Sequence, residues 1–169
     1  MTIEVTPGHA SAVAFVTATD ADAYFTARGI TKWTGTEAEK EASLVRGADF
    51  LERTYAGLWV GSRAETTQAL SWPRTSAKDA EGVDISSTVI PEQIKRANLE
   101  AAYLVITGVD LAPAFTAGIV EEKDKAGAVE TMSKYGEDGA QPPQYLNITR
   151  LLTGLVKSSA SVGVGFAVV

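Results

Sequence analysis

The chain has 169 residues, 45% of them hydrophobic, which suits one folded domain large enough to bury a core. Twenty-one acidic residues against fifteen lysines and arginines give a net charge of -6, which disfavours sequence-independent binding to phosphate polymers. The lack of cysteine excludes disulfide bonds, thiolate metal sites and a cysteine nucleophile. Because alanine supplies much of the apolar material, we predict close-packed helices rather than a thick sheet sandwich.

The first part of the chain predicts an arm followed by a short helix. Residues 1–18 mix Thr, Ala and Val, which favours an extended arm. A helix start follows at Thr19, because Asp20 and Asp22 place negative charge in the first turn, near the positive end of the helix dipole. Gly29 is expected to end this helix in a left-handed conformation.

The clearest predicted element is a long helix over residues 37–55. Thr36 stands three residues before Glu39, the spacing of a capping box in which each side chain bonds the other residue's backbone. Apolar residues then recur at helical spacing and predict one buried stripe. This stripe consists of Ala38, Ala42, Val45, Ala48, Leu51 and Tyr55.

A loop and a third helix are predicted next. Residues 69–84 form a loop in which Pro73 biases Trp72 toward an extended conformation. Pro91 suits the first position of a helix, where its missing amide costs nothing, and Gly108 ends that helix. Its predicted buried stripe is Ile94, Ala97, Ala101, Leu104 and Val105.

The last third of the chain changes pattern. Short β-type runs at residues 119–122 and 128–132 predict a hairpin. Pro143 opens a last helix, with Tyr145, Ile148, Leu152 and Leu155 at helical spacing. We therefore predict a mainly α protein, a compact helical bundle with a small β-hairpin and extended N- and C-terminal arms. Its parts are an arm (1–18), a helical domain (19–157) with a hairpin near 119–132, and an apolar tail (158–169).

The sequence offers little for catalysis, metal binding or membrane insertion. His9 is the only histidine and lies in the arm, so a catalytic triad is not expected. Asp79, Glu81 and Asp84 depart from the spacing of a calcium-binding loop and fit a solvated turn. No apolar run reaches the ~18 residues of a membrane-spanning helix, and Met1–Gly8 lacks the cations of a secretory signal. We expect no enzyme activity, no cofactor, no metal and no membrane partner.

The three tryptophans allow two interpretations. Trp33, Trp59 and Trp72 lie near cations in the sequence, and stacking beside a cationic groove is how single-stranded nucleic acids are held. The segment between Thr36 and Lys78 is neutral overall, however, and tryptophan near a helix end more often anchors a core or an interface. We favour structural anchors, with Arg74 pairing with a carboxylate or stacking on an indole. The residues in question are Trp33, Trp59, Trp72 and Arg74.

Taken together, several segments resemble one family. They are Thr19–Phe25, Lys40–Arg46, Leu58–Gly61, Gln68–Arg74 and the Ile90-Pro91 pair. The chain resembles the head-to-tail connector (adaptor) proteins of tailed bacteriophages, which are often labelled DnaT-like single-stranded-DNA-binding proteins. The likeness covers about residues 19–155, and the Gln-x-Leu-x-Trp-Pro-Arg string is its most specific part.

This resemblance implies a structural role in a virion. It implies a homo-oligomeric ring of about twelve copies that attaches to the portal protein and meets a tail-side connector or tail terminator protein. DNA would pass through the channel without sequence-specific binding, which an acidic lumen permits. The protein would sit in the virion neck, and in the host cytoplasm during assembly. The alternative that the label implies is a single-stranded-DNA-binding accessory of replication.

The residues expected to touch partners lie in the hairpin and near the C-terminus. Residues 158–169 carry no charge, and six of the last eight are apolar. Such a segment could add to a sheet, fill a groove on a neighbour, or fold back on its own core. The candidate partner contacts are Lys123, Lys125, Leu155, Phe166, Val168 and Val169.

Overall fold

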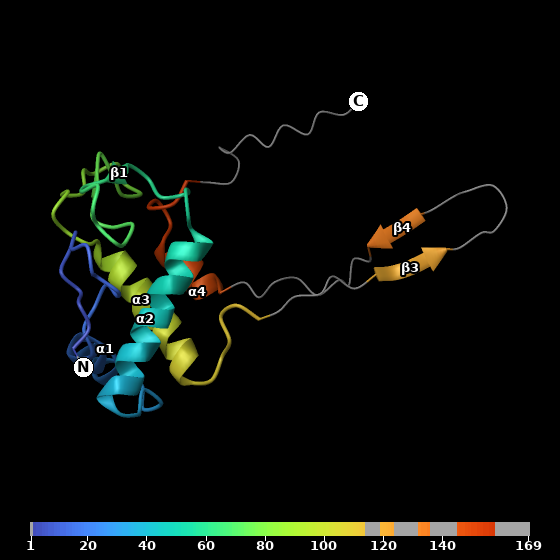
Figure 1. Ribbon diagram of the computed structural model, residues 1–169, viewed down its shortest axis with the longest axis horizontal. Coiled ribbons are helices and arrows are strands. Elements are labelled where there is room, and N and C mark those ends of the chain that lie inside the picture. The colour runs from blue at the N-terminus through green and yellow to red at the C-terminus, as the bar shows by residue number, and fades with distance from the viewer. Residues whose placement is uncertain (1, 114–118, 124–131, 136–144, 158–169) are drawn as a thin grey trace. The chain divides into compact units, whose positions relative to one another are not determined.

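Helices are the main regular elements of the computed structural model, which describes residues 2–113, 119–123, 132–135 and 145–157 (Figure 1). The chain divides into two units, Met1–Leu111 with Tyr145–Val169, and Ala112–Gln144. The protein is mainly helical with small antiparallel sheets, as the sequence predicts. The elements in chain order are α1 (Ala18–Ala27), α2 (Glu37–Thr54), β1 (Ser62–Arg63), β2 (Arg74–Thr75), α3 (Glu92–Ile106), β3 (Ile119–Lys123), β4 (Met132–Tyr135) and α4 (Leu146–Leu151).

The centre of the first unit is the crossing of α2 and α3, which lie side by side (Figure 1). Gly47 permits this close approach, because a Cβ atom there would lie 2.9 Å from the backbone nitrogen of Ala102. Asn98 is fully buried at the crossing, and its Nδ2 donates to the Leu44 carbonyl at 2.9 Å. The two helices are thus joined by packing and by a satisfied buried amide.

The N-terminal arm is packed onto this helix pair. The Phe15 N–H donates to Asn98 Oδ1 at 3.1 Å, and the side chains of Phe15 and Val16 are buried. The Ile3 N–H donates to the carboxylate of Glu41 on α2 at 3.3 Å. Although the arm has an irregular backbone, it supplies part of the core.

The helix α1 begins earlier than the sequence suggests. Thr17, not Thr19, is the N-cap, and its hydroxyl accepts from the Asp20 N–H at 3.1 Å while the Asp20 carboxylate accepts from the Thr17 N–H. The prediction missed this capping box because an aspartate takes the place usually held by Glu or Gln. Gly29 has φ = 64°, so the predicted left-handed end is confirmed.

The capping box of α2 is confirmed, whereas part of its predicted buried stripe is wrong. The Thr36 N–H donates to Glu39 Oε2 at 2.7 Å, and the Glu39 N–H donates to the Thr36 hydroxyl. Ala38 and Ala42 are exposed, because alanine tolerates either face of a helix while the larger leucines determine which face turns inward. The buried residues of α2 are Glu41, Ser43, Leu44, Gly47, Ala48 and Leu51.

The helices α3 and α4 follow the predicted apolar spacing with different bounds. Pro91 is the N-cap of α3 rather than its first residue, and Leu104 is only half-buried. The helix α4 ends at Leu151, after which the chain turns back and Leu155 accepts a hydrogen bond from the Val60 N–H at 3.0 Å. None of the helices in the described part of the chain has the length and apolar character that a bilayer crossing requires.

The second unit contains an antiparallel hairpin of β3 and β4. Lys123 pairs with Met132 and Glu121 with Lys134, and the register shifts between Ile119 and Glu121. The first predicted strand is confirmed. The second described strand, Met132–Tyr135, meets the predicted run 128–132 at Met132 and extends beyond it, while residues 128–131 lie outside the described residues.

Candidate functional site

The Trp-Pro-Arg string lies in the core of the first unit. Trp72 is 1% exposed, and its ring meets that of Trp59 edge-on with centroids 6.1 Å apart. The Trp72–Pro73 peptide bond is cis. Trp33 is also buried and packs against Phe25, with ring centroids 4.6 Å apart. All three tryptophans therefore serve the interior rather than a surface.

The Arg74 guanidinium donates to three backbone carbonyls in two stretches of the chain. Its Nε donates to the Val60 carbonyl at 2.6 Å, Nη2 to Gly61 at 2.8 Å and Nη1 to Ser71 at 3.0 Å. Neither the carboxylate nor the indole expected from the sequence is its hydrogen-bonding partner. Burial lowers the pKa of the Arg74 guanidinium from its ordinary value, and the nearby charge of Arg63 lowers it further.

The rest of this string is also bonded to its own chain. The buried amide of Gln68 donates to the carbonyls of Leu70 and Pro73, at 2.6 and 3.1 Å. Ser71 donates through its N–H and its hydroxyl to the Glu52 carboxylate, at 2.8 and 2.6 Å. We name residues 68–74 the clamp, because their polar side chains fix the loop between β1 and β2 to the end of α2.

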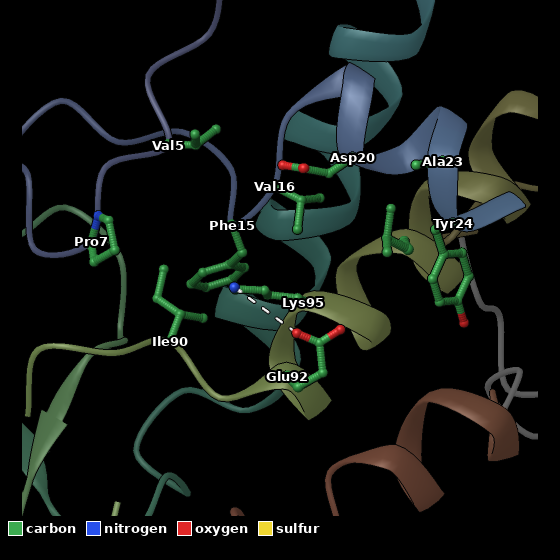
Figure 2. A pocket seen from close by; sticks show the side chains of 11 residues that line it. Val5, Pro7, Phe15, Val16, Asp20, Ala23, Tyr24, Ile90, Glu92 and Lys95 are labelled. Atoms are coloured by element: carbon green, nitrogen blue, oxygen red, sulfur yellow. Dashed lines mark ion pairs between the residues drawn. The ribbon is translucent and has the colours of Figure 1, made fainter. Parts of the chain in front are cut away.

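A groove lies where the N-terminal arm, α1 and the start of α3 meet, and we call it the arm groove (Figure 2). It encloses about 450 Å³. Seven of its eleven lining residues are apolar, and they come from the arm, from α1 and from the chain around α3. The lining residues are Val5, Pro7, Phe15, Val16, Asp20, Ala23, Tyr24, Ile90, Glu92, Lys95 and Leu99.

The charged groups of the arm groove have partners within the chain. Lys95 Nζ lies 3.9 Å from Glu92 Oε2, the pair that Figure 2 marks, and Asp20 belongs to the capping box of α1. The Tyr24 hydroxyl donates to Glu100 Oε1 at 3.0 Å. Burial raises the pKa of Tyr24, and the charge of Glu100 raises it further. The groove therefore offers a ligand apolar surface together with polar groups that are already engaged within the chain.

The described side chains do not form a stacking platform for bases. Among them the large exposed hydrophobic residues are four valines and Leu146, and no aromatic ring is in the exposed class. Some cations are also engaged. The Arg28 guanidinium lies 3.5 Å from the centre of the Tyr24 ring, and Lys40 Nζ lies 2.7 Å from Asp22 Oδ1. The groove of cations and exposed aromatics that holds single strands is not seen in this part of the chain.

The predicted partner contacts have different outcomes. Leu155 is fully buried, so the prediction that it touches a partner is wrong: its apolar side chain completes the core below α4. Lys123 is the last residue of β3. The remaining candidates lie outside the described residues: Lys125, Phe166, Val168 and Val169.

The residues considered for catalysis and metal binding stay apart. His9 is exposed, and its Nδ1 accepts from the Ser11 N–H at 3.2 Å. Asp79 uses its carboxylate to accept from the N–H groups of Glu81 and Val83, both at 2.9 Å, as a turn residue does. Across the described ranges no group of three His, Asp or Glu side chains is placed to hold a metal ion.

Comparison with known families places the whole described chain within a family model. A family model described as "Putative DnaT-like ssDNA binding protein" matches residues 1–168. The chain belongs to this family. No curated protein and no solved structure matches the chain significantly. The DnaT-like match includes the arm, the clamp and the arm groove. The sequence did not predict the groove, because its walls come from segments some 70 residues apart in the chain.

Proposed function

We propose that this DnaT-like protein is a structural connector subunit of a tailed bacteriophage. Copies would form a ring that attaches to the portal protein and joins the DNA-filled head to the tail. The resemblance of the clamp string and the flanking helices to connector proteins supports this role. The protein would act in the virion neck, with assembly in the host cytoplasm and no catalysis.

The observation that carries the proposal is how the described body uses its side chains. Its aromatic rings are packed inside or half-buried, and the polar groups of the clamp bond to their own chain. Among the described residues, the arm groove offers a partner a partly apolar surface on an acidic protein. Such a surface suits protein contacts, and its charge lets DNA pass without adhering.

The mass of the purified full-length protein, alone and mixed with the cognate portal protein, tests this function. Light scattering after size exclusion should give a multiple of 17.8 kDa, either alone or in the presence of the portal. A monomer under both conditions would overturn the connector role. A ring whose lumen is mainly basic would overturn the idea that DNA slides past an acidic wall.

Single-stranded-DNA binding is the second candidate, and the family description favours it directly, whereas that description does not mention a connector. A titration of labelled oligonucleotide should then give a Kd of about 1 μM or less that rises steeply with salt, because binding releases counterions. An absence of binding at low salt would end this alternative. The net charge of -6 makes that absence the result we expect.

A further inference from the structure

We propose that the arm groove binds residues 162–169 of a neighbouring copy of the chain. The inference rests on the proposed function in one respect, since it requires copies to assemble. It assigns the contact that holds two adjacent copies together. The structure supplies the groove, and the sequence supplies the chemistry of its occupant.

The shape of the groove suits a short apolar segment. Its volume of about 450 Å³ lies within the range of sites that enclose a small ligand or a few side chains. Phe15, Val16 and Ile90 form a buried apolar floor, and Leu99 of α3 adds to it. The Asn98 amide holds this floor in place, because it accepts from the Phe15 N–H and donates to α2. An occupant would therefore meet a preformed surface, at a lower entropic cost than a loop that must first be ordered.

The charges around the groove select against a charged occupant. Lys95 lies beside Glu92, and the Asp20 carboxylate accepts from Thr17. A charged ligand would lose hydration without meeting a free counter-charge from these groups, whereas an apolar one loses little. Residues 158–169 carry no charge, and 162–169 read Val-Gly-Val-Gly-Phe-Ala-Val-Val. Six apolar side chains separated by small glycines can lie close to a floor of this kind.

Three features favour a neighbouring copy as the source of the segment. Copies with a net charge of -6 repel one another, and an uncharged segment allows contact at the least electrostatic cost. The last described residue before the segment, Lys157, is held in place, because its N–H donates to the Leu58 carbonyl at 2.8 Å. A segment and a groove at different places on one chain make a head-to-tail contact between copies, and contacts of this type form a ring when the rotation from copy to copy closes.

Disulfide cross-linking tests the contact directly, since the chain contains no cysteine. Ala23→Cys places a thiol on an exposed residue that lines the groove, and Ala167→Cys places one in the segment. The two single variants, one carrying a size tag, are mixed as full-length proteins and oxidised mildly. We expect a covalent heterodimer on a non-reducing gel, in a yield at least about tenfold above that of the control pair.

The control pair replaces Ala23→Cys with Ala38→Cys, an exposed alanine on α2 that does not line the groove. Equal yields in both pairs would overturn the proposal. A double variant that closes a disulfide only within one chain would also overturn it, because the segment would then occupy its own groove. If rings form without this cross-link, the connector function stands and the inference alone fails.

A second experiment measures the strength of assembly instead of disulfide cross-linking. Ala23→Arg introduces a long charged side chain into the groove from an exposed helical position, so folding should be unaffected. We expect the apparent association constant to fall at least about tenfold, with the same loss on deletion of residues 162–169. The matched control, Ala27→Arg, adds the same charge on α1 outside the groove and should assemble normally. Normal assembly of Ala23→Arg would contradict the proposal.

Discussion

The clamp and the arm groove contain similar kinds of residue but use them in opposite ways. Both contain buried aromatic and aliphatic side chains, but in the clamp the polar side chains of Gln68 and Arg74 bond to the backbone of the same chain. In the arm groove, by contrast, the apolar residues Phe15 and Ile90 line an open cavity of about 450 Å³. One region is completed by its own chain, and the other offers surface that a second molecule can cover.

The core at the clamp also contains two buried hydrogen-bond donors that have no acceptor in the described part of the chain. The indole Nε1 atoms of Trp59 and Trp72 are buried without a hydrogen-bond partner among the described residues. An unsatisfied buried donor costs about 1–3 kcal/mol, whereas a buried tryptophan removes a large apolar area from water. Packing of the two rings therefore outweighs the lost hydrogen bonds. The difference between the regions predicts that substitutions in the clamp reduce stability, whereas those at exposed groove positions reduce assembly.

The largest effect should come from Trp72→Ala. The side chain is 1% exposed, so its removal leaves a cavity and should lower the free energy of unfolding by about 3–5 kcal/mol. Urea denaturation of the purified protein measures the loss. A variant that unfolds at the wild-type midpoint but fails to assemble would place Trp72 at an interface. The clamp would then serve assembly, as the groove is proposed to do.

A smaller loss is expected from Arg74→Lys. A lysine keeps the charge but cannot reproduce the planar fork that reaches Val60 and Gly61 together. Hydrogen bonds from a charged donor are worth about 1.5–3 kcal/mol, so unfolding should become easier by about that amount. The same urea experiment checks this, with Arg53→Lys at an exposed position as the control. Equal midpoints for the two variants would show that the carbonyl contacts contribute little.

Thr17→Ala tests the role of the α1 N-cap at the edge of the arm groove. It removes the hydroxyl that accepts from the Asp20 N–H and should cost about 1 kcal/mol, as loss of an N-cap usually does. It also removes one of the two hydrogen bonds that the Asp20 carboxylate accepts from Thr17 at the edge of the arm groove. We therefore expect weaker assembly together with the small loss of stability, measured by light scattering and thermal unfolding. Thr17→Ser, which retains the cap, should restore both.

The smallest effect should come from Asp22→Asn, which changes stability in acid and the contact between α1 and α2. Burial raises the pKa of Asp22, but hydrogen bonds from Lys40 and Trp33 lower it by more, so its pKa lies below the ordinary value. A depressed folded-state pKa stabilises the protein fully above about pH 4, and this contribution disappears as the pH falls through the folded value.

Asp22→Asn should therefore be less stable than the wild type at pH 7, by less than about 1 kcal/mol because the side chain is half exposed. The two proteins should converge as the pH falls below the depressed pKa of Asp22. Urea midpoints measured from pH 7 downward follow the convergence. A constant difference at all pH values would show that the charge of Asp22 is not responsible.

Interactions within one helical turn could be predicted from the sequence, whereas interactions between distant segments could not. The Thr36–Glu39 box was predictable because both partners lie within one turn. Which face of α2 is buried was only partly predictable, because Ala38 is exposed, whereas Glu41 is buried and accepts from the Ile3 N–H of the arm. The partners of Arg74 were missed since a pattern of side chains does not reveal backbone carbonyls.

The arm groove was beyond prediction for a related reason. The Phe15 N–H meets Asn98, 83 residues away, and this single bond places the arm against α3. Nothing in the local sequence around Phe15 or Ile90 indicates that the two lie on one surface. The composition of residues 158–169 did suggest an interaction segment, but not where it would bind.

The Tyr145 hydroxyl donates to the Asp110 carbonyl at 2.9 Å, and this bond has a consequence for stability. It ties together the two points at which the chain leaves and re-enters the first unit around Ala112–Gln144. Once the ends of an insertion are held, each doubling of its length adds only about 0.6 kcal/mol of closure entropy. Changes in the length of this excursion are therefore expected to cost little stability, while the helices around Asn98 keep their arrangement.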